Sequence, residues 1–465
     1  MGHSRMRDLT EGSVTRHLVA LSGFIAISML FQTLYFLAGL YWVGTLGKES
    51  IAAVSLAGNL TFLVLALTQM LSVGTMTLVS HAVGAGMKRR AVHAFNQAYI
   101  LSLVAGVAFA VAAYALRGVY TSWLGADAET ARLGREYLGW FIPALLLEFL
   151  VVAMGSGLRG TGIVKPSVII QVGTVTLNMV LAPILIFGWG TGRPLGVAGA
   201  ALASLASIAV AVVAFFWFFL RSTTYLRFNL ADWKPEWTRW WAMMRVGAPA
   251  GAEFLVLTIY LIVVQAIIRP FGAAAQAGFG ISGRLMQAMF LPVVAIGLAA
   301  APLVGQSFGA RKGERVRQSF SSASMLATIL MLVCVALCQL FSKALVAGFS
   351  REPAVIVFGS ECLRILSWNL VSLGLAYTAS SIFQGLGHTL PPLVSSAIRL
   401  ALFTIPAYAL SRRAGFEIRD VWYLSAASVV VQAVLNVTLL RREFGRTLRF
   451  DAPHGEGVAA VARPG

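Results

Sequence analysis

Long apolar segments separated by short polar breaks run along almost the whole chain. Each is about 20 residues or more, the length of helix that crosses the hydrocarbon core of a bilayer. Twelve such segments are predicted as membrane-spanning helices, at residues 17–45, 52–82, 92–120, 134–158, 164–188, 196–221, 242–270, 276–308, 317–347, 354–384, 390–411 and 420–441. The pattern therefore predicts an all-α polytopic membrane protein with twelve transmembrane helices.

One offset relates the two halves of the chain. Residues 79–95 (VSHAVGAGMKRRAVHAF) resemble residues 304–320 (VGQSFGARKGERVRQSF), 225 positions later, and the same offset pairs Tyr35 with Tyr260. Such an internal repeat indicates a tandem duplication. Six helices per copy return the chain to its starting side, so the two six-helix repeats are parallel and related by a pseudo-twofold axis along the membrane normal. Duplicated membrane bundles of this kind are typical of transporters that rock two halves about a central site.

The composition places most of the protein surface in lipid. Hydrophobic residues make up 58% of the 465 residues, charged residues 12%, and the mean hydropathy is +0.80. Soluble domains carry about 25% charged residues, so a soluble globular protein is excluded. Lys and Arg outnumber Asp and Glu by 36 to 18. No basic domain stands outside the apolar segments, so this excess is interpreted as cytoplasmic loop charge, and no nucleic-acid partner is expected.

Basic residues gather on the side of the predicted membrane domain that holds both termini, which has 22 of them against 11 on the other side. Both termini are therefore predicted to be cytoplasmic, in the cell inner membrane. No cleavable signal peptide is expected, because the first apolar run is long enough to remain as a helix. The predicted divisions are a cytoplasmic N-terminus (1–16), an N-lobe (17–221), an amphipathic linker (222–241), a C-lobe (242–441) and a disordered cytoplasmic tail (442–465).

Two smaller features have structural interpretations. The linker alternates tryptophans with charges, at Trp233, Trp237, Trp240 and Trp241. This pattern favours a short amphipathic helix at the headgroup level over a platform for stacking substrate. His81 ends an apolar run and is expected to cap that helix. The cysteines lack metal-ligand spacing and are interpreted as buried small apolar residues: Cys334, Cys338 and Cys362.

Several motifs resemble those of bacterial MATE (multidrug and toxin extrusion) transporters. They are LYFLAGLYWVGTLGKESIAAVSLAG (34–58), LNMVLAPILIFGWG (177–190), PLGVAGAALAS (194–204), LVGQSFGA (303–310) and FQGLGHTLPP (383–392). The similarity covers about residues 15–442. It implies two six-helix lobes around a V-shaped cavity, a monomer, and no cofactor. It further implies export of amphipathic or cationic organic compounds in exchange for protons or sodium ions.

The chain departs from that family at two acidic positions. Relatives usually read Tyr-Asn-x-x-Asp in the first helix, where this chain has Tyr35 followed by Gly39. In the fifth helix they read Asn-x-x-x-Asp, and here Asn178 is followed by Ala182. Neutral groups do not bind and release protons near neutral pH. The family's usual coupling chemistry in the N-lobe is therefore not expected here.

Ion coupling needs a group that changes its charge or its ligands during transport, and two carboxylates lie well inside predicted spans. Glu253 follows VGAPAG (246–251), where Pro249 and the glycines are expected to break the start of the seventh helix. Either it binds the coupling H+ or Na+, or it makes a structural hydrogen bond. Glu148 has only apolar sequence neighbours. It either contributes to coupling or forms a hydrogen bond across a helix interface.

Polar residues in the other spans are candidates for the substrate cavity: Gln32, Tyr35, Asn178, Tyr260, Arg284 and Arg399. The two tyrosines, as repeat partners, are expected near the interface between the lobes, and Tyr260 shares a helix face with Glu253. Gln32 has an interhelical hydrogen bond as its alternative. Arg284, Arg364 and Arg399 either brace helix ends by snorkelling or face the cavity and favour an anionic substrate.

Three functions remain open. The main hypothesis is secondary active efflux of an amphipathic or cationic compound in exchange for H+ or Na+. A flippase for a lipid-linked or other anionic amphiphile is the second, because the N-lobe lacks its aspartates and the C-lobe contains three arginines. A transport-inactive partner or receptor is the third. An enzyme is not expected, since no nucleophile–base set or metal cluster stands out in the sequence.

Overall fold

The computed structural model describes residues 8–125, 127–189, 192–221, 225–413, 415–448 and 450, apart from the side chains of Phe36 and Leu40. Across these residues the chain is helical and forms no strand. The N-lobe contains α1 (Val14–Gly44), α2 (Lys48–Gly84), α3 (Lys88–Leu124), α4 (Ala128–Gly160), α5 (Lys165–Phe187) and α6 (Gly196–Arg221). The C-lobe contains α7 (Trp237–Ile268), α8 (Ala273–Gly309), α9 (Gly313–Ala347), α10 (Pro353–Leu366), α11 (Asn369–Leu386), α12 (Leu390–Leu410) and α13 (Ile418–Thr447).

The structure confirms the all-α membrane fold. Eleven described helices are long and apolar enough to cross a membrane, and the pair α10 and α11 makes a twelfth span with a bend of 50°. The span predicted at 354–384 therefore consists of two helices joined at a bend. The Gln339 side chain of α9 enters the break, and its amide donates to the carbonyl of Arg364 (2.7 Å) and to the hydroxyl of Ser367 (2.9 Å). A polar side chain that satisfies freed backbone groups is a common cause of a sharp kink.

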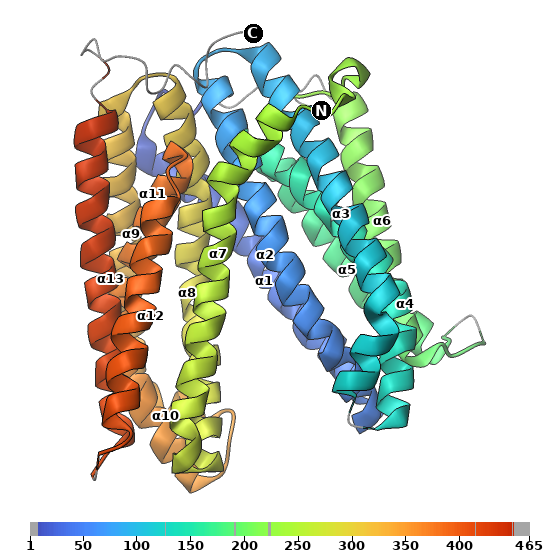
Figure 1. The fold of residues 1–465 in the computed structure, drawn as a ribbon, viewed down its shortest axis with the longest axis vertical. Coiled ribbons are helices and arrows are strands. Elements are labelled where there is room, and N and C mark those ends of the chain that lie inside the picture. The colour runs from blue at the N-terminus through green and yellow to red at the C-terminus, as the bar shows by residue number, and fades with distance from the viewer. Residues whose placement is uncertain are drawn as a thin grey trace.

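The two lobes meet at one end of the molecule and diverge toward the other (Figure 1). Glycines line the contact between α2 and α8, and the repeat relates them to one another. A Cβ added to Gly84 would lie 2.0 Å from the carbonyl oxygen of Gln306, and one added to Gly309 would lie 2.2 Å from that of His81. Both distances are far inside van der Waals contact, so only glycine permits this approach.

A pair of symmetry-related hydrogen bonds crosses the same contact. His81 on α2 is 2.8 Å from the carbonyl oxygen of Gly385, measured from Nε2. Gln306 on α8 donates from Nε2 to the carbonyl oxygen of Gly160 at 2.9 Å. Each pair is the repeat partner of the other. His81 therefore links the two lobes, and the expectation that it caps its own helix is wrong.

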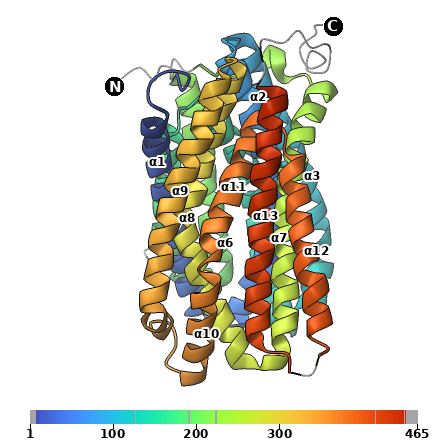
Figure 2. The same cartoon turned by 90° about the vertical axis from the view of Figure 1, so that its left-hand side faces the viewer.

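Both ends of the described chain lie at this closed end. Arg315 at the start of α9 donates to the carbonyl oxygens of Leu9, Glu11 and Gly12, each at 2.8 Å. The last residue before the gap in the description, Leu448, has its carbonyl oxygen 3.1 Å from the Cβ position of Gly313. Figure 2 shows the two lobes from the C-lobe side, with α9 and α13 at the front.

The start of the predicted disordered tail is helical. Helix α13 continues to Thr447, so the first part of the segment 442–465 is helical. Residues 451–465 lie outside the described part of the chain.

The segment between the lobes is not the amphipathic helix expected at 222–241. From residue 225 on, where the segment is described, a short 3-10 helix (Leu230–Trp233) forms, and α7 starts at Trp237. The fully buried Gln97 of α3 holds this segment with four hydrogen bonds. Its amide donates to the carbonyls of Asp232 (2.8 Å) and Lys234 (2.6 Å), and its oxygen accepts from Glu236 N and from the Trp240 indole, both at 3.0 Å. Buried amides need partners, and here the linker supplies them.

Candidate functional site

Glu253 lies on α7 between two helices of the C-lobe. Its Oε2 accepts a hydrogen bond from the hydroxyl of Ser380 on α11 (3.0 Å), and its Oε1 accepts one from Ser396 on α12 (3.2 Å). The side chain is partly buried, and no described basic residue forms an ion pair with it. An ionised carboxylate has about four acceptor positions, so two remain for a proton or a cation.

The helix that carries Glu253 is continuous, contrary to the expected break at Pro249. Helix α7 runs through Pro249 without interruption. The nearby glycines serve a different purpose, because a Cβ on Gly247 would lie 2.0 Å from the carbonyl oxygen of Met70 on α2. The VGAPAG segment thus lets α7 approach the opposite lobe closely, next to the carboxylate.

A chain of polar contacts links Glu253 to Arg399. Gln432 on α13 donates from Nε2 to the Ser396 hydroxyl (2.9 Å) and accepts at Oε1 from Nη1 of Arg399 (3.2 Å). The Arg399 guanidinium lies over the ring of Tyr260, with Cζ 4.4 Å from the ring centroid. Its buried Nε has no hydrogen-bond partner. Carboxylate and guanidinium therefore share one network without forming a direct ion pair.

The candidate site residues of the N-lobe form a polar cluster around one serine. Ser204 on α6 lies 3.2 Å from the Tyr35 hydroxyl and accepts from the Asn178 amide at the same distance. Glu148 lies close enough to Tyr35 to interact with it electrostatically, and it forms no hydrogen bond or ion pair with any described residue. The exposed Gln32 is not part of this cluster. Apart from Glu148, the polar groups of the N-lobe cluster are neutral.

The two repeat-related tyrosines have matching surroundings. The Tyr260 hydroxyl lies 2.7 Å from that of Ser425 on α13, the last helix of its lobe, as Tyr35 meets Ser204 on α6. The ring of Phe403, which the repeat pairs with Asn178, packs against Tyr260 with centroids 5.0 Å apart. Each hydroxyl thus pairs with a serine of its own lobe, and the expectation that both tyrosines lie near the interface between the lobes stays a prediction.

Gly39 and Ala182, the two positions at which the family resemblance leads us to expect aspartate, have no ionisable side chain. A Cβ added to Gly39 meets no atom within 4 Å, so this part of α1 has open surroundings. Ala182 is buried in a small apolar cluster on α5. Of the three arginines singled out in the sequence, Arg284 and Arg364 are exposed and lie outside the C-lobe network. Arg399 alone joins it.

Sequence reasoning missed the hydroxyl and amide groups that connect these residues. A usable signal is present in α13, where buried polar side chains recur every three or four positions on one helix face: Ser425, Ser428, Gln432 and Asn436. In a span that is otherwise apolar, this spacing marks a face that packs against polar partners.

Comparison with known proteins identifies the family. The MatE family model matches residues 25–184 and 249–410. The chain is 25% identical to the probable multidrug resistance protein YoeA of Bacillus subtilis, over 88% of this chain and 90% of that protein. It is 24% identical to the FAD transporter of Shewanella oneidensis, over 80% of this chain and 83% of that protein.

A solved structure is similar over nearly the whole fold. It is an outward-facing multidrug resistance MATE family transporter of the MOP superfamily, and it superimposes with a TM-score of 0.88 at 27% identity, covering 96% of this chain and 99% of the other. The matches span both lobes and both polar clusters described above. The chain therefore belongs to the MatE family, and it is a multi-pass membrane transporter rather than an enzyme.

Proposed function

We propose that this protein exports amphipathic or cationic organic compounds in exchange for H+ or Na+, and that Glu253 binds the coupling ion. The observation that carries the proposal is the environment of this carboxylate. Two serine hydroxyls donate hydrogen bonds to it, no basic residue in the described part of the chain forms an ion pair with it, and it lies where α7 contacts the opposite lobe. Desolvated carboxylates inside a membrane are costly and mark ion pathways.

Transport would proceed by rocking of the two lobes about the contact between α2, α7 and α8. The structure has the lobes in contact at the end that holds the basic loops, which we assign to the cytoplasm of the cell inner membrane. This state would correspond to an outward-facing one, like that of the MATE structure to which the chain is similar. Binding of an ion at Glu253 would change its hydrogen bonds to α11 and α12, and so couple ion occupancy to the packing of α7. The chain would function as a monomer.

The test is transport in proteoliposomes with an imposed proton or sodium gradient, using a fluorescent lipophilic cation as substrate. Glu253→Gln keeps the shape of the side chain but removes its charge and turns one of its two acceptor oxygens into an amide donor, and we expect it to abolish gradient-driven transport. Glu148→Gln tests the second candidate in the N-lobe. Glu314→Gln, at an exposed position on α9, is the matched control and should transport like the wild type. Undiminished transport by Glu253→Gln would contradict the assignment.

Arg399 favours a second candidate, export or flipping of an anionic amphiphile. Its buried Nε lacks a partner and its guanidinium lies beside Tyr260, so it has the capacity to bind a phosphate or carboxylate. The relative from Shewanella oneidensis is named a FAD transporter, and FAD is such an anion. Arg399→Gln should then abolish uptake of FAD or of a fluorescent anionic lipid while uptake of the lipophilic cation persists. The reverse pattern would exclude an anionic substrate.

A third candidate is a transport-inactive partner or receptor. It predicts that neither cations nor anions move under any gradient, although the purified protein is folded. No contact in the described structure favours it over transport.

A further inference from the structure

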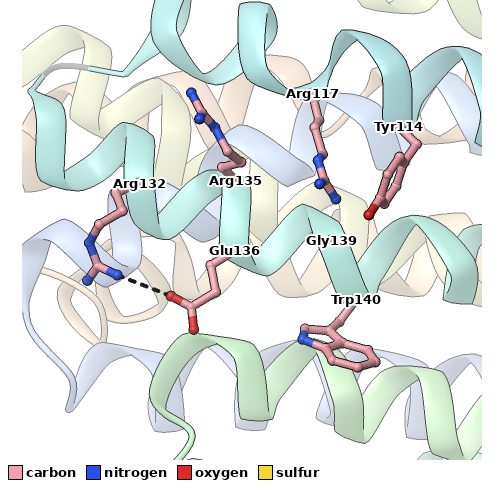
Figure 3. Close-up of a pocket in the computed structure, with 7 residues that line it drawn as sticks. All are labelled: Tyr114, Arg117, Arg132, Arg135, Glu136, Gly139 and Trp140. Carbon is pink, nitrogen blue, oxygen red and sulfur yellow. Dashed lines mark hydrogen bonds and ion pairs between the residues drawn. The ribbon is translucent and has the colours of Figure 1, made fainter.

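A hollow of about 530 Å³ lies between α3 and α4, near the end of the N-lobe opposite the basic loops (Figure 3). It is lined by three arginines, a glutamate, two aromatic residues and a glycine: Tyr114, Arg117, Arg132, Arg135, Glu136, Gly139 and Trp140. These arginines lie on the side that is poor in basic residues, so their clustering at one spot is not explained by membrane orientation.

Two of the arginines cross the helix interface in opposite directions, and each lies against a glycine of the other helix. The Nη1 of Arg117 on α3 is 3.3 Å from the Cβ position of Gly139 on α4. The Cζ of Arg135 on α4 is 3.8 Å from the Cβ position of Gly118 on α3. Each guanidinium thus crosses the interface between α3 and α4 and lies beside a glycine of the other helix.

The nearby carboxylates form ion pairs with the third arginine, Arg132. Arg132 forms ion pairs with Glu129 at 2.7 Å and with Glu136 at 3.4 Å. Arg117 lies over the ring of Tyr114 at 3.6 Å and forms no ion pair with a described carboxylate, and the same holds for Arg135. Two guanidiniums that line the same hollow are therefore left to bind an external anion, and the planar guanidinium group suits bidentate contact with a phosphate.

The positions of these residues match the edge of a bilayer that is centred on the helix midpoints. Helix α3 has 37 residues with its midpoint near residue 106, so Arg117 lies about 16 Å from the helix midpoint at about 1.5 Å per residue. The same count on α4, whose midpoint is near residue 144, places Arg135 about 14 Å away. The hydrocarbon core extends about 15 Å from its midplane. Trp140 and Trp123 are exposed at 47% and 81%, as expected of aromatic side chains in the interfacial belt.

We propose that this hollow binds the phosphate headgroup of an anionic phospholipid in the leaflet opposite the basic loops. Arg117 and Arg135 would hold the phosphate, Tyr114 and Trp140 would flank the glycerol region, and the acyl chains would follow the apolar surface of α3. That surface carries exposed aliphatic side chains toward the middle of the helix: Val104, Val107 and Val111. A lipid bound there would fasten the outer ends of α3 and α4 together.

Native mass spectrometry of the purified, detergent-solubilised protein, titrated with phosphatidylglycerol, tests the proposal. The double variant Arg117→Gln, Arg135→Gln should weaken binding of one lipid by about 10- to 30-fold, the order expected when two interfacial arginines are lost. The matched control, Arg351→Gln with Arg413→Gln, removes the same charge from exposed positions in the C-lobe and should bind like the wild type. The double variant Arg117→Lys, Arg135→Lys should show an intermediate loss of binding, because lysine keeps the charge but lacks the planar guanidinium group that makes bidentate contacts.

Equal binding by the wild type and the glutamine double variant would overturn the proposal, as would an equal loss in the control. Displacement of the lipid by millimolar inorganic phosphate, or tight binding of inorganic phosphate alone, would mean that the site takes free phosphate and not a lipid. Thermal unfolding of the glutamine variant without added lipid checks that it is folded. If it is not, the single variant Arg135→Gln, at an exposed position, is used instead and should show a smaller loss in the same direction.

Discussion

The contact between α2 and α8 predicts that a single methyl group at Gly84 changes which side of the protein is open. A Cβ at this position would lie 2.0 Å from the carbonyl oxygen of Gln306 and 2.7 Å from its carbonyl carbon. Cβ atoms essentially never lie closer than 3.0 Å to such atoms, so Gly84→Ala forces the two backbones at least 1.0 Å further apart. Overpacking of this kind costs about 1–3 kcal/mol.

That cost applies only to the state in which the two helices touch. If the lobes rock, separation at this end relieves the strain, so the population of the observed state falls relative to the other by about 5- to 150-fold. The distance between spin labels at the opposite ends of the lobes measures this change. Lys48 and Arg351 are exposed positions at those ends and are suitable labelling sites once the native cysteines are replaced. Gly84→Ala should add a shorter component to the distance distribution as the outer ends approach.

Gly58→Ala on the same helix is the matched control, because a Cβ there meets no atom within 4 Å. It should leave the distances unchanged. If Gly84→Ala gives the same distribution as the wild type and the control, the contact is not a conformational switch point. A broad distribution with loss of folded protein would show instead that the glycine is needed for folding alone.

Other predictions concern the polar contacts. Ser396→Ala removes the donor to Glu253 and the acceptor of Gln432. The lost hydrogen bonding is worth about 1–2 kcal/mol, so gradient-driven transport should fall by about tenfold. The amount of folded protein should not change. Gln97→Leu removes four buried hydrogen bonds and should lower the free energy of unfolding by about 2–4 kcal/mol, seen as a lower thermal midpoint in detergent and faster trypsin cleavage of the linker. Gln318→Leu, an exposed change on the repeat-related helix, should do neither.

The helices could be predicted well because, in a membrane protein, the residues of each segment alone indicate that it is helical. Any apolar run of sufficient length must become a helix, since the lipid offers no partner for backbone hydrogen bonds. The repeat offset also predicted matching helices in the two halves. The bounds of α2 and α8 differ by 225 residues at both ends. Glu253, Tyr260 and Arg399 could also be selected, because ionisable and aromatic polar residues inside a span need a partner or a function.

The contacts that give those residues their surroundings depended on helix faces far apart in the sequence. Ser380 and Ser396 are ordinary residues in their own segments and matter because α11 and α12 bring them to Glu253. The conformation of the linker likewise follows from Gln97, more than a hundred positions earlier in the chain. No local pattern near either site indicates these partners.

The sequence by itself determined the number of membrane spans, the duplicated frame and the candidates for ion binding, because apolar length, periodicity and isolated charge are read from neighbouring residues. Only the tertiary structure decided what the glycines and polar groups do. Gly84 and Gly247 serve close contact between the lobes, and Pro249 sits in a continuous helix. Such roles are set by which backbone faces meet in space, and packing across two lobes is a property of the whole chain.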